Sequence, residues 1–139
     1  MPRTTEVPIR VRSTDVDAQG ITNNSRYFQY FEQARLDHLV AIGVMRSGPT
    51  TGGASRLFTI AETTCRFKAP TYHRDELVVR TWTGEVRTRS FILEFQIVRT
   101  EDQALIAEGV AALVWLDEDN RPTAMDDEVR AALEGSLLP

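Results

Sequence analysis

The sequence predicts an α+β fold in which one antiparallel sheet wraps around a single long helix. An aromatic-rich amphipathic segment at about residues 25–42 indicates the helix, and about five long segments of strand character indicate the sheet. The links between the last four strands are only a few residues long, whereas a parallel crossover takes a dozen or more, so we expect hairpins. The 139 residues fit one domain, 1–139.

The N-terminal elements follow from the hydropathy pattern. Residues 5–12 alternate polar and apolar, the period of a half-buried strand. Residues 13–24 are rich in turn formers and helix-capping types, so they should form a loop that leads into the helix. Gly43 ends the helix. On a helical wheel one arc holds Tyr27, Tyr30, Phe31, Ala34, His38, Ala41 and Ile42, flanked by Phe28 and Leu39, while Gln29, Gln33 and Asp37 lie opposite.

The C-terminal two thirds of the chain predict the rest of the sheet. Residues 44–55 combine Gly, Ser and Thr and should form a mobile loop. Strands are expected near 56–69, 76–87, 89–100 and 104–116, joined by turns around 72–75, 87–89 and 101–103, and a last helix is expected at about 127–134. Alternation places Phe91, Leu93, Phe95 and Ile97 on one face of their strand.

Composition excludes several classes of protein. No apolar run approaches the roughly 18 residues of a membrane helix, and the N-terminus lacks a signal peptide, so we expect a cytoplasmic protein without a membrane partner. Cys65 is the only cysteine and there are two histidines, which argues against a metal centre. Residues 100–139 carry two Lys and Arg against ten Asp and Glu, and this acidic tail argues against a nucleic-acid partner.

The stretch before the long helix is the candidate site. It offers Asp15 and Asp17, then Gly20, then Asn23 and Asn24. One interpretation is a turn followed by a helix cap. The other begins from the free N–H groups of the first helical turn, which carry partial positive charge and suit a developing oxyanion. With a carbonyl oxygen docked there, Asp17 could act beside the carbonyl carbon as nucleophile or as base for water.

Residues 15–35 also resemble the signature of hot-dog-fold acyl-CoA thioesterases of the 4-hydroxybenzoyl-CoA thioesterase type. In that family Asp-x-Asp-x-x-Gly precedes Tyr-x-x-Tyr-Phe-Glu-x-Ala-Arg, and the similarity continues with Phe67-Lys-Ala-Pro70 and with Arg87-Thr-Arg89-Ser90-Phe91. The resemblance covers nearly the whole chain in the same order. It implies a five-stranded hot-dog fold and hydrolysis of an acyl-CoA thioester to a carboxylic acid and free coenzyme A. No cofactor is implied, since coenzyme A is part of the substrate.

The resemblance further implies roles for single residues. The catalytic carboxylate corresponds to Asp17, and the amide that polarises the thioester carbonyl corresponds to about Asn24. The implied substrate-binding residues are Gly20, Asn23, Tyr27, Arg87, Arg89 and Ser90, the last three resembling the family's patch for the phosphates of coenzyme A. Many relatives have His-Val after the glycine, but this chain has Ile21-Thr22, so no neighbouring imidazole assists Asp17. A thiolate leaves without a strong general acid, so one carboxylate can suffice.

Other functions and roles stay open beside this one. The alternatives are a non-catalytic acyl-CoA-binding module, an acyl-carrier-protein thioesterase whose arginines meet an acidic protein, and a hydratase. The hydratase would need a catalytic histidine, and neither His38 nor His73 is well placed for that role. His38 is expected to be a core or interface residue, and Cys65 to line the core or a pocket. Glu32 and Arg35 are three apart on the helix and should pair, unless Arg35 reaches a partner subunit.

The predicted sheet leaves one face and an edge uncovered, which predicts an oligomer. The resemblance implies a homodimer with its sites at the subunit boundary, or a homotetramer built from two such dimers.

Overall fold

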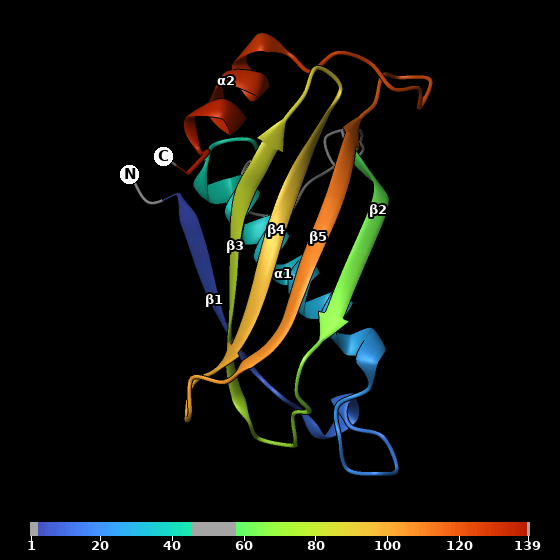
Figure 1. Ribbon diagram of the computed structural model, residues 1–139. Helices are drawn as coiled ribbons and strands as arrows, with labels where there is room; N and C mark the ends of the chain where they lie inside the picture. The colour runs from blue at the N-terminus through green and yellow to red at the C-terminus, as the bar shows by residue number, and fades with distance from the viewer. Residues whose placement is uncertain (1–2, 46–57, 139) are drawn as a thin grey trace.

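The computed structural model describes residues 3–45 and 58–138 and confirms an antiparallel sheet with a long helix against it (Figure 1). The strands, in the order β1-β3-β4-β5-β2 across the sheet, are β1 (Thr4–Arg10), β2 (Phe58–Phe67), β3 (Glu76–Val86), β4 (Ser90–Arg99) and β5 (Leu105–Trp115). The helices are α1 (Asn24–Ala41) and α2 (Asp127–Gly135), with a short 3-10 helix, η1 (Ser13–Asp15), that the pattern did not predict. Residues 46–55 of the loop predicted at 44–55 lie outside the described residues, as do residues 56 and 57 of the next predicted strand.

The link between β2 and β3 was expected to be a hairpin, and this prediction was wrong. The β3–β4 and β4–β5 links are hairpins, but β2 pairs with β5 at the sheet edge while β3 lies between β1 and β4. Residues 68–75 therefore run sideways along the end of the sheet. Three strand spacings amount to about 14 Å, which a segment of this length spans easily at about 3.3 Å per extended residue.

Helix α1 covers one face of the sheet (Figure 1). The aromatic arc of α1 belongs to the hydrophobic core. The Phe31 ring stacks on Phe95 of β4 with centroids 4.7 Å apart, and it lies so close to β5 that a side chain at Gly109 would collide with it. Ala41 departs from the prediction: it is exposed because it is the last residue of α1. Most of the arc behaves as expected, with Ile42 half-buried, Tyr27, Tyr30, Phe31, Ala34, His38 and Leu39 buried, and Gln29, Gln33 and Asp37 exposed. The flanking Phe28, however, is 37% exposed.

His38 is confirmed as a core histidine. Its Nδ1 lies 2.8 Å from Thr5 Oγ1 on β1, and its Nε2 lies 3.0 Å from Thr83 Oγ1 on β3. Ser136, at the C-terminal cap of α2, donates to the same Thr83 hydroxyl at 2.6 Å. The imidazole therefore connects α1 to two strands and, through Thr83, to α2. Burial lowers the pKa of His38 from 6.5 to about 4.

Acidification should weaken the fold through His38. The unfolded chain, with an ordinary histidine pKa near 6.5, binds more protons than the folded chain between about pH 6.5 and 4, so the free energy of unfolding falls as the pH falls through this window. At pH values below both pKa values, this loss in the free energy of unfolding amounts to about 3 kcal/mol. Above about pH 6.5 the pKa shift of His38 has no effect on stability. Urea unfolding at several pH values should show that, between about pH 6.5 and 4, the free energy of unfolding falls by about 3 kcal/mol more in wild type than in His38→Gln. Parallel losses in the two proteins would contradict the prediction.

Candidate active site

The loop between η1 and α1 is a small hairpin closed at its neck. The Asn23 N–H donates to the Asp15 carbonyl at 2.8 Å, and the Asp17 N–H donates to the Ile21 carbonyl at 2.9 Å. At the tip, the Gly20 N–H donates to the Asp17 carbonyl at 3.0 Å. Gly20 has a φ of 84°, a conformation that favours glycine, so this residue allows the turn at the tip of the loop, independently of any contact with a substrate.

Helix α1 begins where the turn formers predict. Asn23 is the N-cap, and its side chain accepts from the Ser25 N–H at 3.0 Å. Asn24 is the first helical residue, and its N–H finds no acceptor within residues 3–45 and 58–138. The Asn24 amide is therefore a free donor at the positive end of the helix dipole, as the oxyanion role requires.

A groove of about 250 Å³ opens beside this helix start. The groove lies between the loop with the first turn of α1 on one side and the end of β2 with the segment after it on the other. It therefore brings the Phe67-Lys-Ala-Pro70 motif next to the motif of residues 15–35, although the two are far apart in the sequence. Its lining residues are Ile21, Thr22, Asn24, Tyr27, Phe67, Lys68, Ala69 and Pro70. The exposed Asp17 is not among them: its carboxylate accepts from the Gln19 N–H at 2.8 Å.

Buried hydroxyl groups connect the groove wall to the core. The Tyr27 hydroxyl lies 2.9 Å from Thr71 Oγ1, which donates to Thr22 Oγ1 at 2.6 Å, and Thr22 in turn donates to the Thr71 carbonyl at 3.2 Å. Burial raises the pKa of Tyr27, so the phenol stays protonated. The hydroxyl of Tyr27 is thus engaged inside the protein, while its ring lies 5.6 Å from that of Phe67 in the groove.

Asp15 is a buried carboxylate to which sequence reasoning assigned no role. Tyr30 donates to it at 2.9 Å, and Arg12 donates from its backbone N–H at 3.0 Å and from its guanidinium at 3.3 Å. Burial by itself raises the pKa of Asp15, but these hydrogen bonds outweigh burial and hold the pKa below its ordinary value. The only sequence signal was its place two residues before Asp17.

The predicted coenzyme A patch lies at the other end of the molecule. Arg87 and Arg89 are exposed in the β3–β4 hairpin, and Ser90 begins β4. In Figure 1 this hairpin and the loop before α1 are at opposite ends of the sheet, and α1, with 18 residues, is about 27 Å long. Arg87 also pairs with Glu85 at 2.7 Å. A single chain therefore does not bring this patch to Asp17.

Three further expectations concern side chains outside the groove. The part of the chain that the structure describes shows no Glu32–Arg35 ion pair within 4.0 Å, which corrects the prediction of a direct pair: Glu32 is exposed, and burial lowers the pKa of the half-buried Arg35 although the charge of Glu32 raises it. Cys65 is half-buried against the core, as expected, and burial raises its pKa to about 11. Within the described residues no cluster of three His, Cys, Asp or Glu could hold a metal ion.

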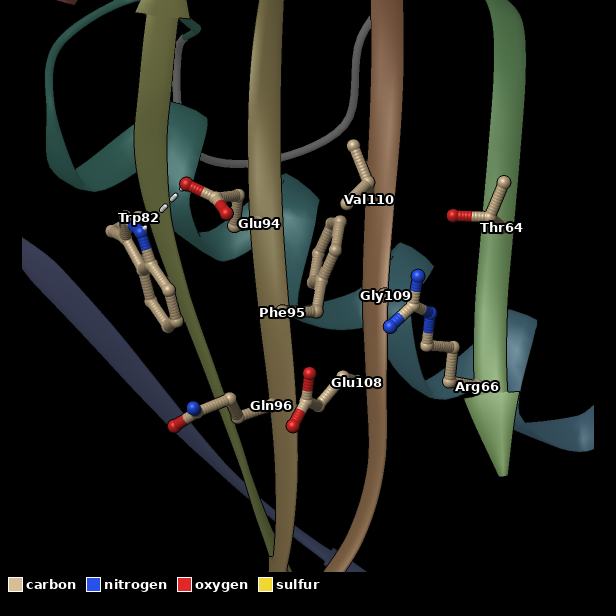
Figure 2. A pocket seen from close by; sticks show the side chains of 9 residues that line it. All are labelled: Thr64, Arg66, Trp82, Glu94, Phe95, Gln96, Glu108, Gly109 and Val110. Carbon is tan, nitrogen blue, oxygen red and sulfur yellow. Dashed lines mark hydrogen bonds between the residues drawn. The ribbon is translucent and has the colours of Figure 1, made fainter. Parts of the chain in front are cut away.

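A larger concavity of about 330 Å³ lies on the sheet face turned away from α1 (Figure 2). Figure 2 shows Glu94 bonded to the Trp82 ring nitrogen at 3.2 Å, with Arg66 and Glu108 on the neighbouring strands. None of the predicted site residues lines this concavity, so it is no candidate for the thioester site. No helix of the described chain has the length and apolarity to cross a membrane.

Comparison with known proteins agrees with this geometry. Residues 11–133 match the model of the thioesterase-like superfamily. The chain is 29% identical to the acyl-acyl carrier protein thioesterase ATL2 of Arabidopsis thaliana, covering 91% of this chain and 66%, just under two thirds, of that protein. It is 25% identical to the acyl-CoA thioesterase YbgC of Haemophilus influenzae over 90% of each. A solved gentisyl-coenzyme A thioesterase superposes with a TM-score of 0.75 and 30% identity, covering 91% of this chain and 98% of that one.

Proposed function

The chain belongs to the thioesterase-like superfamily, and on that premise we propose that it is a hydrolase that cleaves acyl-CoA thioesters into a carboxylic acid and free coenzyme A. The observation that carries the proposal is the groove at the start of α1, where the Asn24 amide has no acceptor among the described residues. The hot-dog fold, in which the sheet wraps around α1, places this helix terminus at the groove.

The proposed reaction uses the helix terminus and one carboxylate. The thioester carbonyl oxygen accepts from the Asn24 N–H, where the helix dipole stabilises the negative charge that develops on it. Asp17 leaves its contact with the Gln19 N–H by side-chain rotation, which its exposure allows, and turns to the carbonyl carbon. It then either attacks directly, forming an anhydride that water opens, or takes a proton from the attacking water. The thiolate of coenzyme A departs, and no step requires a cofactor.

We propose that the working enzyme is a dimer formed along β2. Within residues 3–45 and 58–138 no further strand pairs with either outer strand of the sheet, but Pro8 interrupts the edge of β1, whereas β2 has ten residues and no proline. Ile60 and Phe67 on β2 are 41% and 45% exposed. Pairing of two β2 strands in antiparallel fashion would turn the partner's β3–β4 hairpin toward the loop before α1. The arginines of one chain would then serve the Asp17 of the other.

If Arg87 and Arg89 bind the phosphates of coenzyme A, their loss should weaken the binding only of substrates that carry the nucleotide. Arg87→Ala with Arg89→Ala should raise the KM for acyl-CoA by about 10²- to 10⁴-fold, since two bonds to phosphates are lost and each is worth about 1.5–3 kcal/mol. A short thioester that lacks the nucleotide should be hydrolysed as before. Arg130→Ala, which removes a partly exposed arginine of α2 that, like Arg87, pairs with a nearby glutamate, is the matched control. Equal losses on the long and the short substrate would show that the patch does not bind the nucleotide.

The similarity to ATL2 favours a second candidate function, hydrolysis of acyl-acyl carrier protein. In that case the exposed arginines would meet the acidic surface of the carrier. Thiol release from the same acyl groups carried by coenzyme A and by acyl carrier protein separates the two, because the true carrier gives the higher kcat/KM. Binding without thiol release from either carrier would instead indicate a non-catalytic module.

A further inference from the structure

We infer that Asp15 is a positioning residue of the active site, which through Tyr30 holds the loop of Asp17 in place against the N-terminus of α1. This role presupposes the proposed chemistry at Asp17 and adds a requirement to it: the loop must be held at a defined position relative to the helix that carries the oxyanion donor.

The Asp15 carboxylate is fully buried, and three parts of the chain meet on it. Arg12 comes from the segment after β1, Tyr30 from the second turn of α1, and Arg26 from its first turn, with Nε 3.8 Å from Oδ1. A buried carboxylate is costly unless it is paired, and a packed apolar residue often stabilises a core as well or better. A charged group whose partners come from different segments therefore specifies geometry more than it adds stability.

The backbone of Asp15 transmits this geometry to Asp17. Its carbonyl accepts from Asn23 at the neck of the loop, and the next residue, Val16, bridges to Thr22 across the same loop. Asp17 follows Val16 directly, and its N–H donates a hydrogen bond to the Ile21 carbonyl. A shift of the neck therefore moves the Asp17 backbone by a similar distance.

The loop has two arms, and hydrogen bonds connect each arm to a tyrosine of α1, one directly and one through Thr71. Asp15, on the arm that leads to Asp17, accepts from Tyr30, while Thr22, on the returning arm, belongs to the hydroxyl network of Tyr27. The two tyrosines lie one turn apart on the helix whose first free amide is that of Asn24. The Asp15–Tyr30 bond thus ties the loop that carries the reacting carboxylate to the helix that carries the oxyanion donor. Misplacement of reacting groups by about 1 Å can cost on the order of 10²-fold in rate.

The test removes one hydroxyl group. Tyr30→Phe keeps the ring in the core and deletes the bond to Asp15, so kcat should fall by about 10- to 100-fold while KM changes by less than about twofold. Ser136→Ala is the control, because it also deletes a buried hydroxyl that bonds across the fold, but at the end of the sheet away from the loop. It should lower the unfolding temperature comparably and leave kcat unchanged. Asp15→Asn, which keeps the shape and removes the charge, should change kcat in the same direction as Tyr30→Phe.

A double-variant cycle shows whether the effect passes through Asp17. In an Asp17→Asn background, Tyr30→Phe should have almost no further effect on the residual rate, since there is no carboxylate left to position. If Tyr30→Phe has wild-type kcat, or lowers the residual rate by the same factor as it lowers the wild-type rate, the positioning role is wrong while the proposed function stands. Full activity of Asp17→Asn would overturn both. These outcomes are distinct, so the two failures can be told apart.

Discussion

Replacing Asp17 by asparagine is expected to lower the rate of thioester hydrolysis by about 10²- to 10⁴-fold, the usual contribution of a catalytic acid or base. An amide neither attacks a carbonyl carbon nor takes a proton from water. The exchange should leave the fold intact, because Asp17 is exposed and its side-chain contact, the Gln19 N–H, finds the same acceptor in an amide oxygen. Thiol release at saturating acyl-CoA, together with the unfolding temperature, measures both effects.

Asp37→Asn is the matched control for this experiment. Asp37 is also an exposed carboxylate, but it lies on the outer side of α1, away from the groove, so its replacement should leave the rate within about twofold of wild type. A well-folded Asp17→Asn protein with undiminished turnover would remove Asp17 from the mechanism.

Mixing two defective variants should restore activity if the site is shared between chains. One variant carries Asp17→Asn, and the other carries Arg87→Ala with Arg89→Ala. When subunits exchange at random, half of the dimers are mixed, and one of the two sites in each mixed dimer combines an intact Asp17 with intact arginines. About one quarter of wild-type activity should therefore return at low acyl-CoA concentration.

The alternative to a shared site gives a different result in the same assay. If each chain completes its own site, the mixture shows only the average of the two separate variants, whatever the time allowed for exchange. Light scattering supplies the companion measurement, because a molar mass of 15.7 kDa at micromolar concentration would mean that no dimer forms. Averaged activity would contradict the shared site, and a monomeric mass would contradict the proposed pairing along β2.

Local patterns carried enough information for the helices and strands. Each predicted helix or strand lies within two residues of the observed one where the structure describes it, because the periods of 2 and 3.6 report which side of an element faces the core. The core position of His38 was predicted from its place in the apolar arc, and a helix cap was one interpretation of the turn formers before the helix; the structure identifies that cap as Asn23, for which the resemblance had implied substrate binding.

The candidate site was only partly predictable. The motif placed Asp17, Gly20 and Asn24 around the helix start, and the structure shows a free amide and a groove there. The catalytic role of Asp17 remains a prediction. Asp15 and Tyr30 both belong to the motif, but the motif did not show what they do, since a tyrosine in an aromatic arc looks like any other core residue until its hydroxyl is seen against a carboxylate.

The sequence by itself determined the kinds of elements, their order, and the loop that could carry chemistry. Only the tertiary structure decided that β2 pairs with β5 rather than β3, that Asp15 meets Tyr30, and that Arg87 lies at the far end of the sheet from Asp17. The physical reason is the range of the interactions. Periodicity and capping depend on residues within a turn or two of each other, whereas strand order and buried polar contacts depend on which distant segments compete best for the same core.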